Sequence, residues 1–177
     1  MSWQRNEQVA ASRSEAPTED LSREIILDHY QNPRNHGRLP NPTLANRGHN
    51  PLCGDEIELS LGIDPTDERI FEIAFTGRGC SISQASASMM TEVVKGQRLD
   101  DAEAAVSRFT ERMSSREPPP RELEDELDAL QGVKRYPARV KCALLPWTTL
   151  RESVNLYRHR DLVAAGSQDE FDCADAP

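Results

Sequence analysis

The chain has 177 residues and a net charge of −9, with 37% hydrophobic and 29% charged residues. This size and composition are typical of one compact domain with polar tails. The acidic balance, without a basic patch, argues against binding to nucleic acid or to an anionic membrane. No apolar run approaches the length of a membrane span, and the polar N-terminus lacks a secretory signal. We therefore expect a cytoplasmic protein whose four cysteines serve metal or sulfur chemistry rather than disulfides.

The first third of the chain predicts an arm, a helix and a long loop. Residues 1–17 are rich in Ser, Ala, Gln and Glu and are expected to be disordered. A helix should begin at Thr18 or Asp20, both good capping residues, and end at Asn32-Pro33. Residues 32–52 carry several prolines and glycines and read as an extended loop without regular structure.

A hairpin follows this loop. Apolar residues alternate with polar ones over residues 56–63, which is the period of a half-buried strand. A second alternating segment, residues 71–75, comes after the turn Asp64–Asp67. Two such runs joined by a short turn predict an antiparallel pair.

The remaining chain predicts helices and an irregular excursion. Apolar spacing predicts a helix over residues 81–95, closed by Gly96, and another that Asp100 or Asp101 caps. Three consecutive prolines break the pattern within residues 114–120, and a short acidic helix is expected at 122–130. The last helix should start near Cys142, because Pro146 is then tolerated in its first turn. The predicted fold class is α+β, a small antiparallel sheet (the hairpin plus a possible third strand) packed against several helices. The expected organisation is one domain over residues 18–158 with an insertion at 114–131, followed by an acidic tail at 159–177.

The segment Thr76–Ser83 is the centre of the functional argument. A predicted strand ends here, two glycines turn the chain, and a helix begins one residue after Cys80. A cysteine at a helix start meets the positive end of the helix dipole, which favours the thiolate that binds metal or attacks sulfur. The alternative is a buried, inert cysteine that behaves as a small hydrophobe, and a lone cysteine would favour it.

Three further residues turn Cys80 into a candidate metal site. Cys53 and Asp55 stand two residues apart at the start of a predicted strand, where side chains two apart share a face. Cys142 stands at the predicted start of the last helix. Three thiolates and a carboxylate complete a tetrahedral Zn²⁺ shell, and they also suit a small iron–sulfur cluster. The histidines of the long loop, His36 and His49, are spare ligands at most, and Cys173 in the tail is expected to be a bystander.

The motifs around these residues resemble a known family. Asn50–Asp55 looks like the first ligand motif of the U-type iron–sulfur assembly proteins, which include IscU, SufU and the NifU N-terminal domain. Gly77–Met90 resembles the second motif nearly residue for residue, and Asp28–Asn35 is similar to the family's opening helix and turn. The likeness runs from about Ile25 to Val154.

The resemblance also favours one branch. The IscU-like branch has a histidine directly before the last cysteine, where this chain has Lys141, and the excursion at 114–131 is similar to the insertion of SufU proteins. SufU-likeness implies a zinc-dependent sulfurtransferase that accepts persulfide sulfur from a PLP-dependent cysteine desulfurase and serves downstream cluster assembly proteins. It implies that Cys53, Asp55, Cys80 and Cys142 bind zinc. It further implies that Cys53 accepts the sulfur and that Arg139 lies near the active thiol. The alternatives are a scaffold that assembles and delivers a [2Fe–2S] cluster, and a zinc-stabilised interaction domain without chemistry.

Overall fold

The computed structural model describes residues 16–120 and 122–166, and for residues 16–18 and 161–166 it describes the backbone alone. Its elements in chain order are α1 (Ala16–Gln31), β1 (Leu44–Asn50), β2 (Asp55–Asp64), β3 (Arg69–Arg78), α2 (Ser81–Val94), α3 (Leu99–Ser114), the 3₁₀ helix η1 (Glu126–Arg135) and α4 (Pro137–Gly166). Most of the predicted arm and the end of the predicted tail, with Cys173, lie outside the described residues. Within them, no helix combines the length and the apolar composition needed to cross a bilayer.

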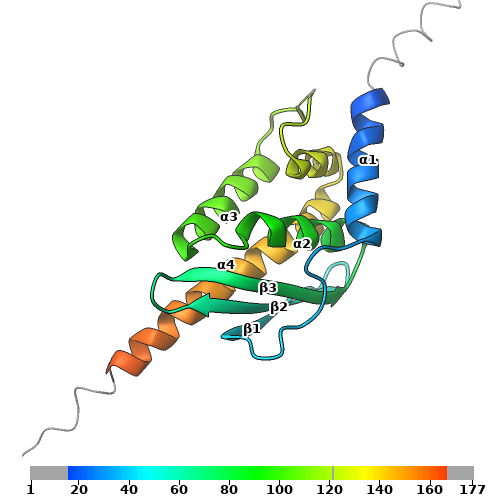
Figure 1. Ribbon diagram of the computed structural model, residues 1–177. Coiled ribbons are helices and arrows are strands. Elements are labelled where there is room, and N and C mark those ends of the chain that lie inside the picture. Colours follow the sequence, from blue (N-terminus) through cyan, green and yellow to red (C-terminus); the bar gives the residue numbers. More distant parts are fainter. Residues whose placement is uncertain (1–15, 121, 167–177) are drawn as a thin grey trace, which may run out of the picture.

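The three strands form one antiparallel sheet in the order β1-β2-β3, with helices packed over one face (Figure 1). This confirms the predicted α+β class. The predicted hairpin is also present, since β2 pairs with β3 from Glu56↔Arg78 to Asp64↔Arg69. A bulge between Gly62 and Ile63 shifts the register. Because of this shift, Phe71 does not share the buried face of β3 with Ile73 and Phe75, as the alternation predicted. Phe71 is 52% exposed, and Ile70 is buried instead.

The loop prediction for residues 32–52 was wrong in its second half, because residues 44–50 form β1. This strand pairs with β2 from Leu44↔Leu61 to Asn50↔Asp55. Its two buried positions are Gly48 and Asn50, so the strand lacks the apolar–polar alternation that marks a half-buried strand in a sequence. Gly48 is required there by close packing: a Cβ atom on it would lie 1.8 Å from Oγ1 of Thr149 in α4.

Helix α2 is buried on nearly all sides and forms the centre of the fold. The small residues 85–88 allow neighbouring elements to approach it closely. Ser86 Oγ donates to the carbonyl oxygen of Ala143 in α4 at 2.6 Å, and it accepts from Nε1 of Trp147 at 3.1 Å. Trp147 in turn stacks on Phe109 of α3, with ring centroids 4.4 Å apart. Near the end of the helix Val94 is buried, whereas Val93 is 36% exposed.

The predicted helix boundaries need four corrections. Helix α1 begins at Ala16 rather than at Thr18 or Asp20, so the last two residues of the predicted arm are helical. Arg98 is the N-cap of α3, and Asp100 and Asp101 lie in its first turn. Their negative charges interact favourably there with the positive end of the helix dipole. Helix α4 begins at Pro137, so Pro146 lies inside the helix and Cys142 in its second turn, not at a helix start. A proline inside a helix removes one backbone hydrogen bond, which the buried packing of α4 against α2 and β1 compensates here. The same helix continues to Gly166, through the start of the predicted tail.

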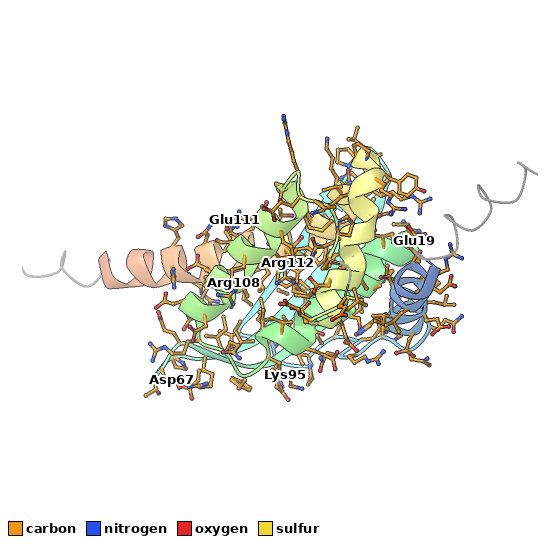
Figure 2. The ribbon with its side chains drawn as sticks, turned by 90° about the horizontal axis from the view of Figure 1, so that it is seen from above. Glu19, Asp67, Lys95, Arg108, Glu111 and Arg112 are labelled. Carbon is orange, nitrogen blue, oxygen red and sulfur yellow. The ribbon has the colours of Figure 1, made fainter. Side chains whose placement is uncertain are left out.

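The excursion after α3 ends in η1, which replaces the short acidic α-helix expected at 122–130. The carboxylate of Asp128 is buried and anchors this segment. It accepts from Arg112 at 3.0 Å, from the Gln131 amide at 2.7 Å and from the backbone N–H of Glu124 at 3.0 Å. Figure 2 shows Arg112 between α3 and η1. The excursion is therefore tied to the domain by a charged network.

Candidate metal centre

The four predicted ligands come from four separate places in the chain. Cys53 lies in the turn between β1 and β2, and Asp55 is the first residue of β2. Cys80 is the N-cap of α2, as predicted, and Cys142 lies within α4. The sheet end, the helix start and α4 meet at one corner of the molecule.

The structure brings these side chains together. The ligand atoms of Cys53, Asp55 and Cys142 all lie within 4.8 Å of one another. The Sγ atoms of Cys53 and Cys142 are 3.2 Å apart. Cys80 joins the group through Asp55, because its Sγ lies 3.4 Å from Oδ2 and its backbone N–H donates to Oδ1 at 3.2 Å. All three thiols are free cysteines.

The local backbone explains how Cys53 reaches the others. The sequence argument expected Cys53 and Asp55 to lie on the same face of one strand. That explanation was wrong, because β2 begins at Asp55 and Cys53 lies in the turn before it. The backbone N–H groups of Cys53 and Gly54 both donate to the carbonyl oxygen of Asn50, at 3.3 and 2.8 Å. Gly54 then adopts a φ of +70°, which a side chain would strain. This tight turn places the thiol of Cys53 back over the first residue of β2.

The four groups differ in their access to solvent. Cys53 is exposed, Cys80 is intermediate, Cys142 is buried, and Asp55 is 3% exposed. A partner molecule approaching this corner therefore meets Cys53 first. Next to it the side chain of Leu52 is 73% exposed.

Burial and mutual contact set the protonation of the group. Burial alone would raise the pKa of Asp55, but hydrogen bonds from Cys142, Cys80, Cys53 and Ser83 together outweigh it and hold the pKa below its ordinary value. The pKa of Cys142 is raised strongly, first by burial, then by its contact with Cys53 and the nearby negative charges. Without a metal ion, the group therefore holds the ionised carboxylate of Asp55 beside the protonated thiol of Cys142.

This donor set fits a thiophilic metal ion. Three sulfur atoms and one carboxylate are ligands that Zn²⁺ takes in tetrahedral sites, and thiolates also hold iron–sulfur clusters. A metal ion binds thiolates, so its binding would release the proton of the Cys142 thiol, and its positive charge would balance the Asp55 carboxylate and the thiolates. The residues present therefore suit either kind of centre.

Other residues that the sequence singles out make no hydrogen bond or ion pair with the four in the part of the chain that the structure describes. Arg139 is exposed in the first turn of α4 and makes no ion pair with any described residue, and Lys141 is also exposed. His36 packs edge-on against Phe75, and His49 faces solvent from β1. The sequence argument missed Ser83, whose hydroxyl lies 3.9 Å from Sγ of Cys80 and donates to its carbonyl oxygen at 3.0 Å. Its place three residues into the helix that Cys80 caps was the available signal.

Comparisons with known proteins place this chain in a family. Residues 21–162 match the family described as the NifU-like N terminal domain. The chain is 41% identical over 139 residues to the zinc-dependent sulfurtransferase SufU of Bacillus subtilis, covering 78% of this chain and 92% of that protein. It is 38% identical over 130 residues to the iron–sulfur cluster assembly scaffold protein IscU of Streptococcus pyogenes, covering 73% of this chain and 80% of that protein.

Solved structures agree with these sequence matches. The crystal structure of SufU from Fervidobacterium islandicum, described as a scaffold protein for the SUF system, has a TM-score of 0.64 at 32% identity, covering 74% of this chain and 94% of that one. The N-terminal NifU-like protein of Brucella abortus has a TM-score of 0.68 at 23% identity over 80% and 97% of the two chains, a likeness of fold. The chain therefore belongs to the NifU-like N-terminal domain family.

Proposed function

We propose that the protein serves iron–sulfur cluster assembly as a zinc-dependent sulfurtransferase, which accepts persulfide sulfur from a cysteine desulfurase. The observation that carries the proposal is the meeting of Cys53, Asp55 and Cys142 within 4.8 Å, with Cys80 tied to Asp55. The likeness to the sulfurtransferase SufU supports the same assignment. Cys53, Asp55, Cys80 and Cys142 would hold the zinc. A bound Zn²⁺ would keep the thiols deprotonated and protected from oxidation until a partner docks.

The exposed thiol is the proposed sulfur acceptor. Cys53 lies on a glycine-containing turn at the surface, whereas Cys142 is buried within α4. The Cys53 thiolate attacks the outer sulfur of the persulfide on the desulfurase cysteine. A new S–S bond forms to Cys53, the S–S bond on the desulfurase breaks, and its electron pair leaves on the desulfurase thiolate. The terminal sulfur keeps its proton, so the transfer needs no external oxidant or reductant.

Two further groups have proposed supporting roles. Asp55 accepts hydrogen bonds from the surrounding thiols, and its ionised carboxylate would hold one ligand position while Cys53 reacts. Arg139, exposed one turn before Cys142, would offset the negative charge of the attacking and leaving thiolates. The exposed Leu52 beside the acceptor gives a docking partner an apolar contact.

A second function has its own support in the IscU likeness, because the Streptococcus pyogenes relative is named a cluster assembly scaffold. In that case the same residues would carry a [2Fe–2S] cluster for delivery. Purification under nitrogen followed by metal analysis separates the two. One zinc per chain and a colourless sample support sulfur transfer. A brown protein that contains iron and acid-labile sulfide instead of zinc would replace it with the scaffold function.

A further inference from the structure

A second group of potential metal ligands lies near the C-terminal end of α2. His29 of α1, Glu92 of α2 and Glu126 of η1 offer one imidazole nitrogen and two carboxylate oxygens, and these atoms all lie within 4.8 Å of one another. The three residues come from three elements that pack together, since α1 contacts both α2 and η1. The group shares no residue with the cysteine site, and α2 is the element that serves both: Cys80 caps its start, and Glu92 lies near its C-terminal end.

The imidazole of His29 is held in one orientation. Its ring is fully buried, and Nδ1 lies 2.8 Å from Oγ of Ser88. The same hydroxyl accepts the backbone N–H of Arg34 at 2.8 Å. Nε2 points the opposite way, to Oε2 of Glu126 at 2.9 Å. Metal-binding histidines are oriented in this manner, with one nitrogen fixed by a neighbour and the other presented to the ion.

The charges of the group are not balanced by the protein. The imidazole of His29 pairs with Glu126, and a carboxylate oxygen of Glu92 lies within 4.8 Å of the ligand atoms of both. The carboxylate of Glu92 has no hydrogen-bond or ion-pair partner among the residues that the structure describes. Two carboxylates this close repel each other, and a divalent cation between them and the imidazole would remove that repulsion.

We propose that His29, Glu92 and Glu126 form a second cation site, for a divalent first-row transition metal ion. An imidazole nitrogen favours such ions over Ca²⁺ and Mg²⁺, and two carboxylates are compatible with Zn²⁺, Co²⁺ or Mn²⁺. Because the ligands belong to α1, α2 and η1, the bound ion cross-links η1, at the end of the excursion after α3, to α1 and α2. The proposal does not rest on the function proposed for the cysteine site.

The test uses the full chain with one zinc already bound, as verified by elemental analysis. Co²⁺ is then added and its binding is followed by calorimetry and absorption. We expect one further Co²⁺ per chain, bound without the intense thiolate-to-cobalt bands that cysteine ligation would give. Glu92→Gln should weaken this binding by at least about tenfold, because it removes a direct ligand. The Glu92 side chain is exposed, so the variant should keep the wild-type unfolding temperature.

Glu124→Gln is the matched control, since Glu124 is also exposed and lies beside η1 but outside the group. It should keep the wild-type Co²⁺ affinity. Three results would overturn the proposal: no saturable second ion in the wild type, equal Co²⁺ affinity in Glu92→Gln and wild type, or thiolate-to-cobalt bands showing that the ion enters the cysteine site. None of these results bears on sulfur transfer by Cys53.

Discussion

Gly79 leaves the space that the carboxylate of Asp55 occupies: a Cβ atom on Gly79 would lie 2.8 Å from Cγ of Asp55 and 2.5 Å from Oγ of Ser83. Contacts this short require one of the neighbours to move. The glycine before Cys80 therefore does more than turn the chain, because it lets the buried carboxylate approach the start of α2.

Gly79→Ala should consequently displace Asp55 and weaken zinc retention by about tenfold or more, a loss typical of disturbed ligand orientation. The measurement is zinc per chain after dialysis against a chelator of graded strength. Gly132→Ala is the control, because a Cβ atom there meets nothing within 4 Å. Equal zinc retention in both variants would show that Asp55 tolerates the movement or is not a ligand.

Asp55→Asn tests the carboxylate itself with little change in shape. The substitution removes the negative charge that accepts hydrogen bonds from Cys80 and faces Cys53 and Cys142. We expect zinc affinity to fall by at least about tenfold, in the range found when metal sites lose a supporting or direct contact. Competition with a chromogenic zinc chelator gives the affinity. An unchanged value would remove Asp55 from the ligand set.

The raised pKa of Cys142 predicts a pH dependence for the metal-free chain. Burial keeps its thiol protonated in the fold, whereas in the unfolded chain it ionises near its ordinary pKa of about 8.5. Its contribution to stability is therefore complete below that pH and is lost as the pH rises, by up to about 1.4 kcal/mol per pH unit. Urea unfolding of the metal-free, reduced chain between pH 7 and pH 10 measures this slope. Cys142→Ser should flatten it, and an equally steep slope in that variant would assign the effect to other groups.

Asp128→Asn tests whether the excursion is anchored by its charged network rather than by the cysteine site. Asp128 is 5% exposed and pairs with Arg112, which is 33% exposed. Removal of its charge leaves Arg112 with a weaker partner, and we expect a loss of about 1–3 kcal/mol in the free energy of unfolding. Zinc content should remain one per chain. Loss of zinc in the variant would instead show that the excursion and the metal centre depend on each other.

Regular alternation or helical spacing made parts of this fold predictable. The hairpin and α2 follow from such patterns, and Gly96, with φ +81°, ends α2 as expected. Strand β1 was missed because its inward positions carry Gly48 and Asn50, which tertiary packing against α4 selects. The start of α4 was predicted too late in the chain, because Pro146 was assumed to lie in the first turn of the helix.

The candidate site was predictable in its members and less so in its geometry. Residue types and motifs around Cys53, Cys80 and Cys142 suggested the group from sequence. The turn through Gly54 that brings Cys53 to Asp55, and the place of Cys142 within α4, depend on long-range packing that local patterns do not encode. The same holds for the pairing of His29 with Glu126, 97 positions apart.

Sulfur transfer to Cys53 is tested most directly by mass spectrometry. The zinc-loaded chain is incubated with a PLP-dependent cysteine desulfurase and labelled cysteine, then alkylated without reductant and digested. The peptide that contains Cys53 should gain one labelled sulfur atom, and Cys53→Ala should abolish the gain on the whole chain. Label on the peptides of Cys80 or Cys142 in that variant, or no label on the wild-type chain, would contradict the account.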